Sequence, residues 1–204
     1  MEIKNVVFDL GNVMISWDPR NLYRKLFADA EKMEYFLANV CTGAWNDELD
    51  AGRPFNEATA QLSARHPEFA GEIRAYRERW GEMLGPPIQS TVKIMDRIKH
   101  GGRHRVFALS NWSAETFPIA EKTCGFFKDF DAMVISGRIG IRKPDPRIFM
   151  HLCREHDVKP EETVFIDDVI ANVLAARGLG FEVIHYRNAA DLESRLVRLN
   201  VLDQ

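Results

Sequence analysis

The sequence has few cysteines, no excess of either charge and no long apolar run. Its three cysteines lack the paired Cys or His spacing of a zinc site, so we expect buried, free thiols. The 27 basic residues against 30 acidic ones disfavour a surface for nucleic acid or an anionic membrane. No apolar run approaches the ~20 residues of a membrane-spanning helix, and the N-terminus lacks the pattern of a signal peptide. We therefore expect a cytoplasmic protein with no nucleic acid or membrane partner, and the composition leaves its oligomeric state open.

What the sequence does contain is a set of short runs rich in Val, Ile and Phe that stop at a polar residue. These runs are residues 6–8, 106–109, 133–135, 164–166 and 181–184. Continuous apolar character is typical of a strand buried on both faces, as in a parallel sheet covered by helices. Stretches with helical spacing lie between the runs, for example at 91–100 and 146–155. The alternation predicts an α/β fold with a doubly wound, mostly parallel sheet.

Residues 17–84 interrupt this alternation of strands and helices. They contain no strand-like run, and their apolar residues have the spacing of consecutive amphipathic helices. Pro86 ends the helical region, because proline cannot continue a helix. We therefore predict an α/β core of residues 1–16 and 86–204, with residues 17–85 inserted as an all-helical cap.

Two helices of the predicted cap have recognisable signals. Asp18 followed by Pro19 is typical of a capping residue and a first-turn proline. The helix that they open carries Leu22, Leu26 and Phe27. The last helix has an apolar residue at every third or fourth position, which predicts a face packed on a neighbour. That face consists of Phe69, Ile73, Tyr76, Trp80 and Met83.

Polar side chains follow three of the predicted strands at the point where each strand ends. Asp9, Ser110 and the pair Asp167 and Asp168 hold these positions. Each residue alone could simply cap the helix that follows it. Sites in parallel sheets form beyond the carboxyl ends of the strands. The presence of polar residues at the ends of three strands therefore favours one shared site.

These residues belong to four motifs that resemble those of the haloacid dehalogenase superfamily, in the usual order. The motifs are FDLGNV at 8–13, LSN at 109–111, RKPD at 142–145 and FIDD at 165–168, with Asn172 beyond. The resemblance spans nearly the whole chain. The first motif is also similar to that of bacterial sugar-phosphate phosphatases, which hydrolyse hexose 1-phosphates such as glucose 1-phosphate. The resemblance therefore implies a magnesium-dependent phosphatase whose partner is a small phosphorylated substrate.

The resemblance also implies how the phosphate is handled. Asp9 would be the nucleophile, and the aspartyl-phosphate that it forms divides one difficult displacement into two easier ones. Two anions repel each other, so Lys143 would bridge the nucleophile and the phosphoryl group as a positive charge. Ser110 and the backbone N–H of Asn111 would hydrogen-bond the phosphate oxygens.

A magnesium site is the second implication. Mg²⁺ takes oxygen ligands and keeps several waters, so a few protein oxygens suffice. By resemblance the ligands are Asp9, Asp168 and the backbone carbonyl of Gly11. Asp167 would ligate through water or orient one of the ligands.

Gly11 departs from the pattern of most phosphatases in the superfamily, which have an aspartate at this position as general acid and base. Such a group contributes about two to four orders of magnitude in rate. The substrate could have a leaving group that departs easily, such as an anomeric sugar phosphate. Another residue could act instead, for example one from the cap, or turnover could be weak or lost. We favour the first explanation, because the sugar-phosphate phosphatases that the chain resembles carry the same glycine.

Several residues could meet the leaving group of the substrate. Trp17 and Trp112 could stack on a sugar, although packing is the more common role of a tryptophan. Trp45, Asn46 and Asp47 could reach the pocket from the cap. The sequence does not choose among them.

Two other functions fit parts of the pattern. A 2-haloacid dehalogenase uses the same aspartate and releases halide without a proton, which agrees with Gly11. The adjacent Asp167 and Asp168 disfavour it, because they would repel a carboxylate substrate unless a cation were bound. A phosphate-metabolite binding protein with little turnover also agrees with Gly11, but such a protein gains nothing from Asp9 facing its ligand.

Overall fold

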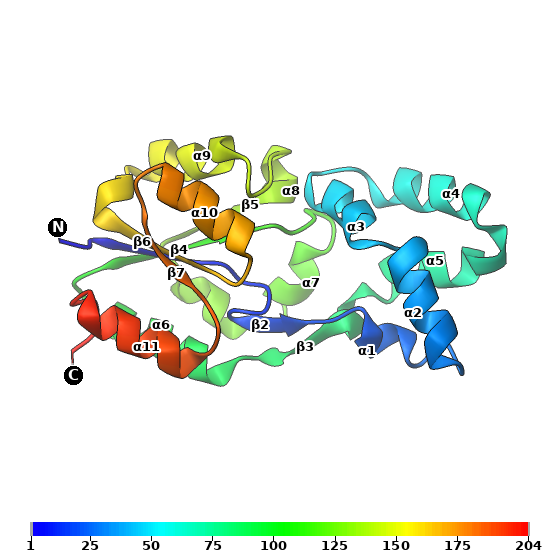
Figure 1. Ribbon diagram of the computed structural model, residues 1–204, viewed down its shortest axis with the longest axis horizontal. Helices are drawn as coiled ribbons and strands as arrows, with labels where there is room; N and C mark the ends of the chain where they lie inside the picture. The colour runs from blue at the N-terminus through cyan, green and yellow to red at the C-terminus, as the bar shows by residue number, and fades with distance from the viewer. Residues whose placement is uncertain (1, 204) are drawn as a thin grey trace.

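A five-stranded parallel sheet forms the centre of the α/β part of the chain (Figure 1), in a computed structural model that describes residues 2–203. Its strand order is β5-β4-β1-β6-β7, and every neighbouring pair is parallel. The strands are β1 (Asn5–Phe8), β4 (Arg105–Ser110), β5 (Ala132–Ile135), β6 (Thr163–Asp167) and β7 (Glu182–His185). The order reverses at the central β1, which confirms the predicted doubly wound sheet.

Helices cover both faces of this sheet (Figure 1). One face carries α6 (Gln89–His100) and α11 (Ala189–Arg198), and the other carries α9 (Pro146–His156) and α10 (Ile170–Gly178). Shorter helices, α7 (Phe117–Glu121) and α8 (Ser136–Ile139), follow β4 and β5. The helices α6 and α9 confirm the two that were predicted between the strands, each with bounds shifted by one or two residues.

The two faces of the sheet have separate hydrophobic cores. Val6 and Phe8 point into the core that also holds Met95 of α6, whereas Val7 points into the core that holds Phe149 of α9. All of these side chains are buried. Successive residues of a strand face opposite sides, so a strand between two cores must be apolar at every position.

A helical insertion, residues 20–83, lies beside the sheet (Figure 1). Its helices are α1 (Arg20–Tyr23), α2 (Ala30–Asn39), α3 (Gly43–Asp50), α4 (Phe55–Arg65) and α5 (Ala70–Glu78), with 3₁₀ turns η1 (Pro67–Phe69) and η2 (Trp80–Met83). The residues predicted to form one buried stripe are all buried, but they occupy α5 and both 3₁₀ turns and not a single continuous helix.

The start of the insertion differs from the sequence prediction. Asp18 does accept a hydrogen bond from the backbone N–H of Arg20 at 2.9 Å, as a capping residue would. The helix nevertheless ends at Tyr23, so Leu26 and Phe27 lie beyond it. Phe27 is still buried, through ring contacts with neighbouring aromatic residues. Its burial comes from tertiary packing, which capping signals do not report.

The ends of the insertion form a two-stranded antiparallel ribbon of β2 (Ile15–Trp17) and β3 (Leu84–Pro87). The prediction that residues 17–84 hold no strand was wrong at both ends, because Trp17 pairs with Leu84. Proline has no N–H to donate, but it is tolerated in a strand with a neighbour on only one side. The pairing joins segments far apart in sequence, so no local sequence pattern predicts it.

All three cysteines are free and buried, as predicted; they are Cys41, Cys124 and Cys153. No helix in the described residues has the length and apolar character needed to cross a bilayer.

Gly137 in α8 supports the loop that follows β4, and we predict that Gly137→Ala destabilises the protein. A Cβ there would contact the backbone nitrogen of Ala114 and lie 2.7 Å from the carbonyl oxygen of Trp112. Overpacking of this kind costs about 1–3 kcal/mol of unfolding free energy, which urea denaturation would measure. The control is Gly71→Ala in α5, where nothing lies within 4 Å of the added Cβ. That change should be neutral or stabilising by up to about 1 kcal/mol. Equal stability of the two variants would contradict the prediction.

Candidate active site

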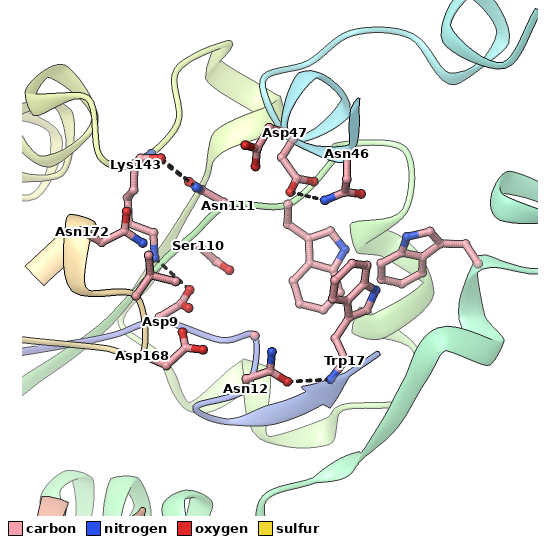
Figure 2. A pocket seen from close by; sticks show the side chains of 15 residues that line it. Asp9, Asn12, Trp17, Asn46, Asp47, Ser110, Asn111, Lys143, Asp168 and Asn172 are labelled. Carbon is pink, nitrogen blue, oxygen red and sulfur yellow. Dashed lines mark hydrogen bonds and ion pairs between the residues drawn. The ribbon is translucent and has the colours of Figure 1, made fainter. Parts of the chain in front are cut away.

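The carboxyl ends of β1, β4 and β6 open into one cavity of about 210 Å³. The residues predicted for the site that line it are Asp9, Gly11, Ser110, Asn111, Lys143 and Asp168. Figure 2 shows Asp9, Ser110 and Asp168 on one side of the cavity, with Asn46 and Trp17 on the other. Asp167 does not line the cavity, since it is fully buried behind Lys143.

Lys143 is the central cation of the site, and its side chain is 1% exposed. Its ammonium donates hydrogen bonds to Oδ1 of Asp9 at 2.9 Å and to Oδ2 of Asp167 at 2.7 Å. A third bond runs to the carbonyl oxygen of Leu109 at 2.7 Å. An ammonium group has three donors, so these bonds use all of them. The lysine is thereby held against the ends of three neighbouring strands.

Burial and charge act in opposite directions on the groups around this lysine. Burial lowers the pKa of Lys143, but the carboxylates of Asp167 and Asp9 together raise it by more than burial lowers it. The net shift of the pKa is upward, so the ammonium stays charged. For Asp9, burial is the largest influence and raises the pKa to about 7, although Lys143 opposes the shift. The pKa of Asp168 is also raised, first by burial and then by the charge of Asp167. The site therefore has more negative charge than its single ammonium offsets.

Asp167 is held from several sides. Asn172 donates from Nδ2 to both carboxylate oxygens at 3.1 Å, and the backbone N–H of Val169 donates to Oδ1 at 2.8 Å. Together with the bond from Lys143, both carboxylate oxygens of Asp167 therefore accept hydrogen bonds from at least two donors. These contacts make Asp167 a support for Lys143, whereas the role predicted for it was to orient or bind a metal ligand.

The acidic cluster suits a divalent cation. Asp9, Asp167 and Asp168 each offer a carboxylate oxygen, and these oxygens lie within 4.8 Å of one another. Oxygen donors with surplus negative charge are what a hard cation such as Mg²⁺ requires. The residues present therefore fit the predicted metal.

The side chain of Asn111 contacts the backbone of Lys143, which the sequence did not suggest. Its side-chain Nδ2 donates to the carbonyl oxygen of Lys143 at 2.9 Å, and its Oδ1 accepts from the backbone N–H of Lys143 at 2.8 Å. This two-point bond positions the backbone of the lysine beside the end of β4.

The other wall of the cavity comes from the insertion, the ribbon and the loop after β4. Sequence reasoning named Trp17, Trp112, Asn46 and Asp47 as residues that could reach the pocket, and all four line it. Trp45 does not line it; the ring packs edge-on against Tyr76, with ring centroids 5.0 Å apart.

Sequence reasoning missed Asp50 and Trp80, which also line the cavity. A usable signal existed for Asp50. It lies four residues after Asn46, so a helix through this segment places both side chains on one face. Trp80 had been assigned to a buried stripe, and its ring also packs against Trp112 at the cavity.

The sequence model of the haloacid dehalogenase-like hydrolase family matches residues 3–180, most of the chain. The chain is a haloacid dehalogenase-like hydrolase. The family predicted from the four motifs is therefore confirmed.

Two relatives of this hydrolase have named activities. It is 26% identical over 215 residues to the D-ribitol-5-phosphate phosphatase of Bacteroides thetaiotaomicron, covering 95% of this chain and 97% of that protein. It is 28% identical over 193 residues to the phosphoglycolate phosphatase of Thiobacillus denitrificans, covering 90% of this chain and 82% of that protein.

Solved structures share the fold of the hydrolase. A haloacid dehalogenase family enzyme from Bacteroides thetaiotaomicron, in a magnesium complex, superposes with a TM-score of 0.75 at 22% identity, covering 97% of this chain and 100% of that chain. An L-2-haloacid dehalogenase from Xanthobacter autotrophicus gives a TM-score of 0.63 at 19% identity, covering 98% and 84%. The fold therefore does not distinguish a phosphatase from a dehalogenase.

Removing the central ammonium should destabilise this hydrolase. In metal-free buffer, Lys143→Met leaves the carboxylates of Asp9 and Asp167 buried without their cation, which typically costs about 3–5 kcal/mol of unfolding free energy. Protonation relieves unpaired buried carboxylates, so the loss should be larger near about pH 8 than near about pH 5. Urea denaturation at both pH values provides the measurement.

The matched control is Lys93→Met, at an exposed position of α6, which should change stability by less than about 0.5 kcal/mol. A Lys143→Met protein as stable as this control would show that the buried ion pairs do not carry the stability assigned to them.

Proposed function

We propose that this hydrolase is a magnesium-dependent phosphatase that cleaves small phosphate monoesters with Asp9 as the nucleophile. One observation carries the proposal: the Asp9 carboxylate lies at a cavity, bonded to a buried ammonium and beside two further carboxylates. The acidic cluster would repel an anionic substrate without a cation, and a phosphate monoester is the substrate that such a cation suits. The phosphatase names of the two relatives described above support the same reaction class.

The metal would be held by Asp9, Asp168 and the carbonyl of Gly11, with Asp167 in support. When bound, Mg²⁺ supplies positive charge that allows the carboxylate and the phosphate to approach each other. The adjacent charge of Asp167 adds to the attraction for a cation.

The residues of the chain would carry out the displacement in two steps. An oxygen of Asp9 forms a bond to phosphorus while the bond from phosphorus to the leaving oxygen breaks. Lys143 keeps the nucleophile in place and offsets charge, and Ser110 and the N–H of Asn111 bind the phosphate oxygens. Water then attacks phosphorus and releases Asp9 as a carboxylate.

The far wall of the cavity supports a hydroxylated leaving group. Trp17, Trp80 and Trp112 provide apolar ring surface, and Asn46 and Asp47 provide hydrogen-bonding groups beside it. Aromatic surface combined with a few polar groups suits a sugar or polyol. We therefore propose sugar phosphates as substrates, with a preference for hexose 1-phosphates.

The insertion would act as the cap of the enzyme, within the proposed boundaries of 17–85 for the cap and 1–16 with 86–204 for the core. It reaches the core through an ion pair between Arg142 and Asp47, at 2.8 Å. A cap in this position excludes water from the reacting phosphate.

Phosphate release from a panel of phosphorylated metabolites tests the proposal. The wild type should release phosphate with Mg²⁺ and lose activity when a chelator removes it, regaining activity when Mg²⁺ returns. Asp9→Asn should lower kcat by about three orders of magnitude or more, because the variant lacks the carboxylate that bonds to phosphorus.

Other outcomes would redirect the assignment. Release that survives Asp9→Asn contradicts the proposed chemistry. Chloride release from a 2-chloroacid without Mg²⁺ would establish a dehalogenase, and saturable binding of a sugar phosphate without release would establish a binding protein.

Hexose 1-phosphate should be hydrolysed faster than hexose 6-phosphate. The anomeric oxygen departs more easily, which matters because position 11 provides no acid to protonate it. Comparing kcat on the two esters measures the effect. Equal rates, or a faster 6-phosphate, would remove the leaving-group argument.

A further inference from the structure

Asp50 is a partly buried carboxylate at the cavity for which the steps above have no role. It is the last residue of α3 and lines the same cavity as Asp9. Burial raises the pKa of Asp50 to about 7, and the charge of Asp47 raises it further, while the Ser113 backbone, Arg142 and Asn46 pull it down. Near neutral pH the group therefore exists in both protonated and ionised forms, as a proton donor in catalysis requires.

The Asp50 carboxyl is held by a chain of hydrogen bonds inside the insertion. Asn46 donates from Nδ2 to Oδ2 of Asp50 at 2.9 Å. The hydroxyl of Tyr76 donates to Oδ1 of Asn46 at 2.8 Å, which orients the amide with its NH₂ toward Asp50. The backbone oxygen of Asp50 also accepts from the Ser136 hydroxyl at 2.6 Å, so the end of α3 is attached to the core. Asn46 thus holds the carboxyl of Asp50, while Ser136 of the core holds its backbone.

The other acids that line the cavity are already engaged. Asp9 is bonded to Lys143, and Asp47 is paired with Arg142. Asp168 belongs to the acidic cluster that suits the metal. Of the acidic side chains lining the cavity in residues 2–203, Asp50 is the one left for the leaving group.

Position 11, two residues after the nucleophile, does not provide a proton donor for the leaving oxygen either. Gly11 has no carboxyl, and an added Cβ there would meet nothing within 4 Å. The space beside Asp9 is therefore free of protein atoms at this point, and a proton for the leaving oxygen has to come from elsewhere.

We propose that Asp50 is the general acid that protonates the leaving oxygen, from the insertion and not from position 11. This inference rests on the proposed phosphatase function. As Asp9 bonds to phosphorus, the electron pair of the breaking phosphorus–oxygen bond stays on the leaving oxygen. That oxygen takes the proton of Asp50 and departs as an alcohol.

The second step restores the acid. The ionised Asp50 accepts a proton from the water that attacks phosphorus, and the electron pair of the phosphorus–oxygen bond to Asp9 returns to Asp9. A hexose 1-phosphate needs this proton less than a 6-phosphate does, so hydrolysis of the 6-phosphate should depend more strongly on Asp50.

The test compares two esters that differ in their need for a proton. p-Nitrophenyl phosphate has a leaving group that departs as an anion, whereas hexose 6-phosphate has an alkoxide that must be protonated. Asp50→Asn, which keeps an oxygen for Asn46 to donate to, should lower kcat/KM on the 6-phosphate about 100-fold and on p-nitrophenyl phosphate by less than about threefold. The ratio kcat/KM reports the steps up to formation of the aspartyl-phosphate, so it leaves out the second step, which the two esters share. Gly11→Asp added to this variant should restore at least about tenfold on the 6-phosphate.

Glu48→Gln is the matched control, because it removes an exposed carboxylate of the same helix α3 that does not line the cavity. It should leave kcat/KM on both esters unchanged within about twofold. The wild type on hexose 6-phosphate should also lose kcat as pH rises through about 7, and Asp50→Asn should lack this decline. The charged and titratable groups facing Asp50 are Asp47, Arg142 and Tyr76, and burial raises the pKa of Tyr76 well above its ordinary value.

The outcomes separate the two proposals. An active wild type whose Asp50→Asn variant loses the same factor on both esters, or loses nothing, overturns the acid role and leaves the phosphatase intact. A wild type inactive on both esters with Mg²⁺ overturns the phosphatase proposal and this inference with it. Thermal unfolding of Asp50→Asn verifies that any loss is not a loss of folded protein.

Discussion

The buried ammonium of Lys143 is the interaction on which the site is built. A charge removed from water costs several kcal/mol or more unless it is paired and fully hydrogen-bonded. Here two carboxylates and a backbone carbonyl satisfy all three of its donors. Because these partners belong to the ends of β1, β4 and β6, the lysine also sets the relative positions of the groups that face the cavity. Asn111 contributes by holding the backbone of the lysine at two points.

The second half of the site comes from the insertion. Asn46, Asp47 and Asp50 lie on the single helix α3, and two contacts with the core, from Ser136 and Arg142, hold that helix above the cavity. The charged groups around Lys143 belong to the α/β part of the chain. The opposite wall takes its polar groups from α3 and its indole rings from the ribbon, from η2 and from Trp112, which follows β4.

Several features of the fold were readable from local patterns, and others were not. The continuous apolar runs were strands because their side chains alternate between two cores, as Val6 and Val7 do. The stripe ending at Met83 was buried as its apolar spacing predicts, although its residues divide between α5 and two 3₁₀ turns. The ribbon was missed, since Trp17 pairs with Leu84 across the whole insertion. The first helix was predicted too long, because an Asp-Pro signal marks where a helix begins and says nothing of where it ends.

By itself, the sequence determined the sheet and the edge at which Asp9, Ser110 and Asp168 gather, because parallel strands present their carboxyl ends together. Only the tertiary structure decided that Asp167 turns toward Lys143 and away from the cavity, and that Asp50 reaches it from the insertion. The physical reason is the range of the forces involved. Strand and helix patterns follow from neighbours along the chain, whereas the direction of a buried charge depends on partners that only folding brings close.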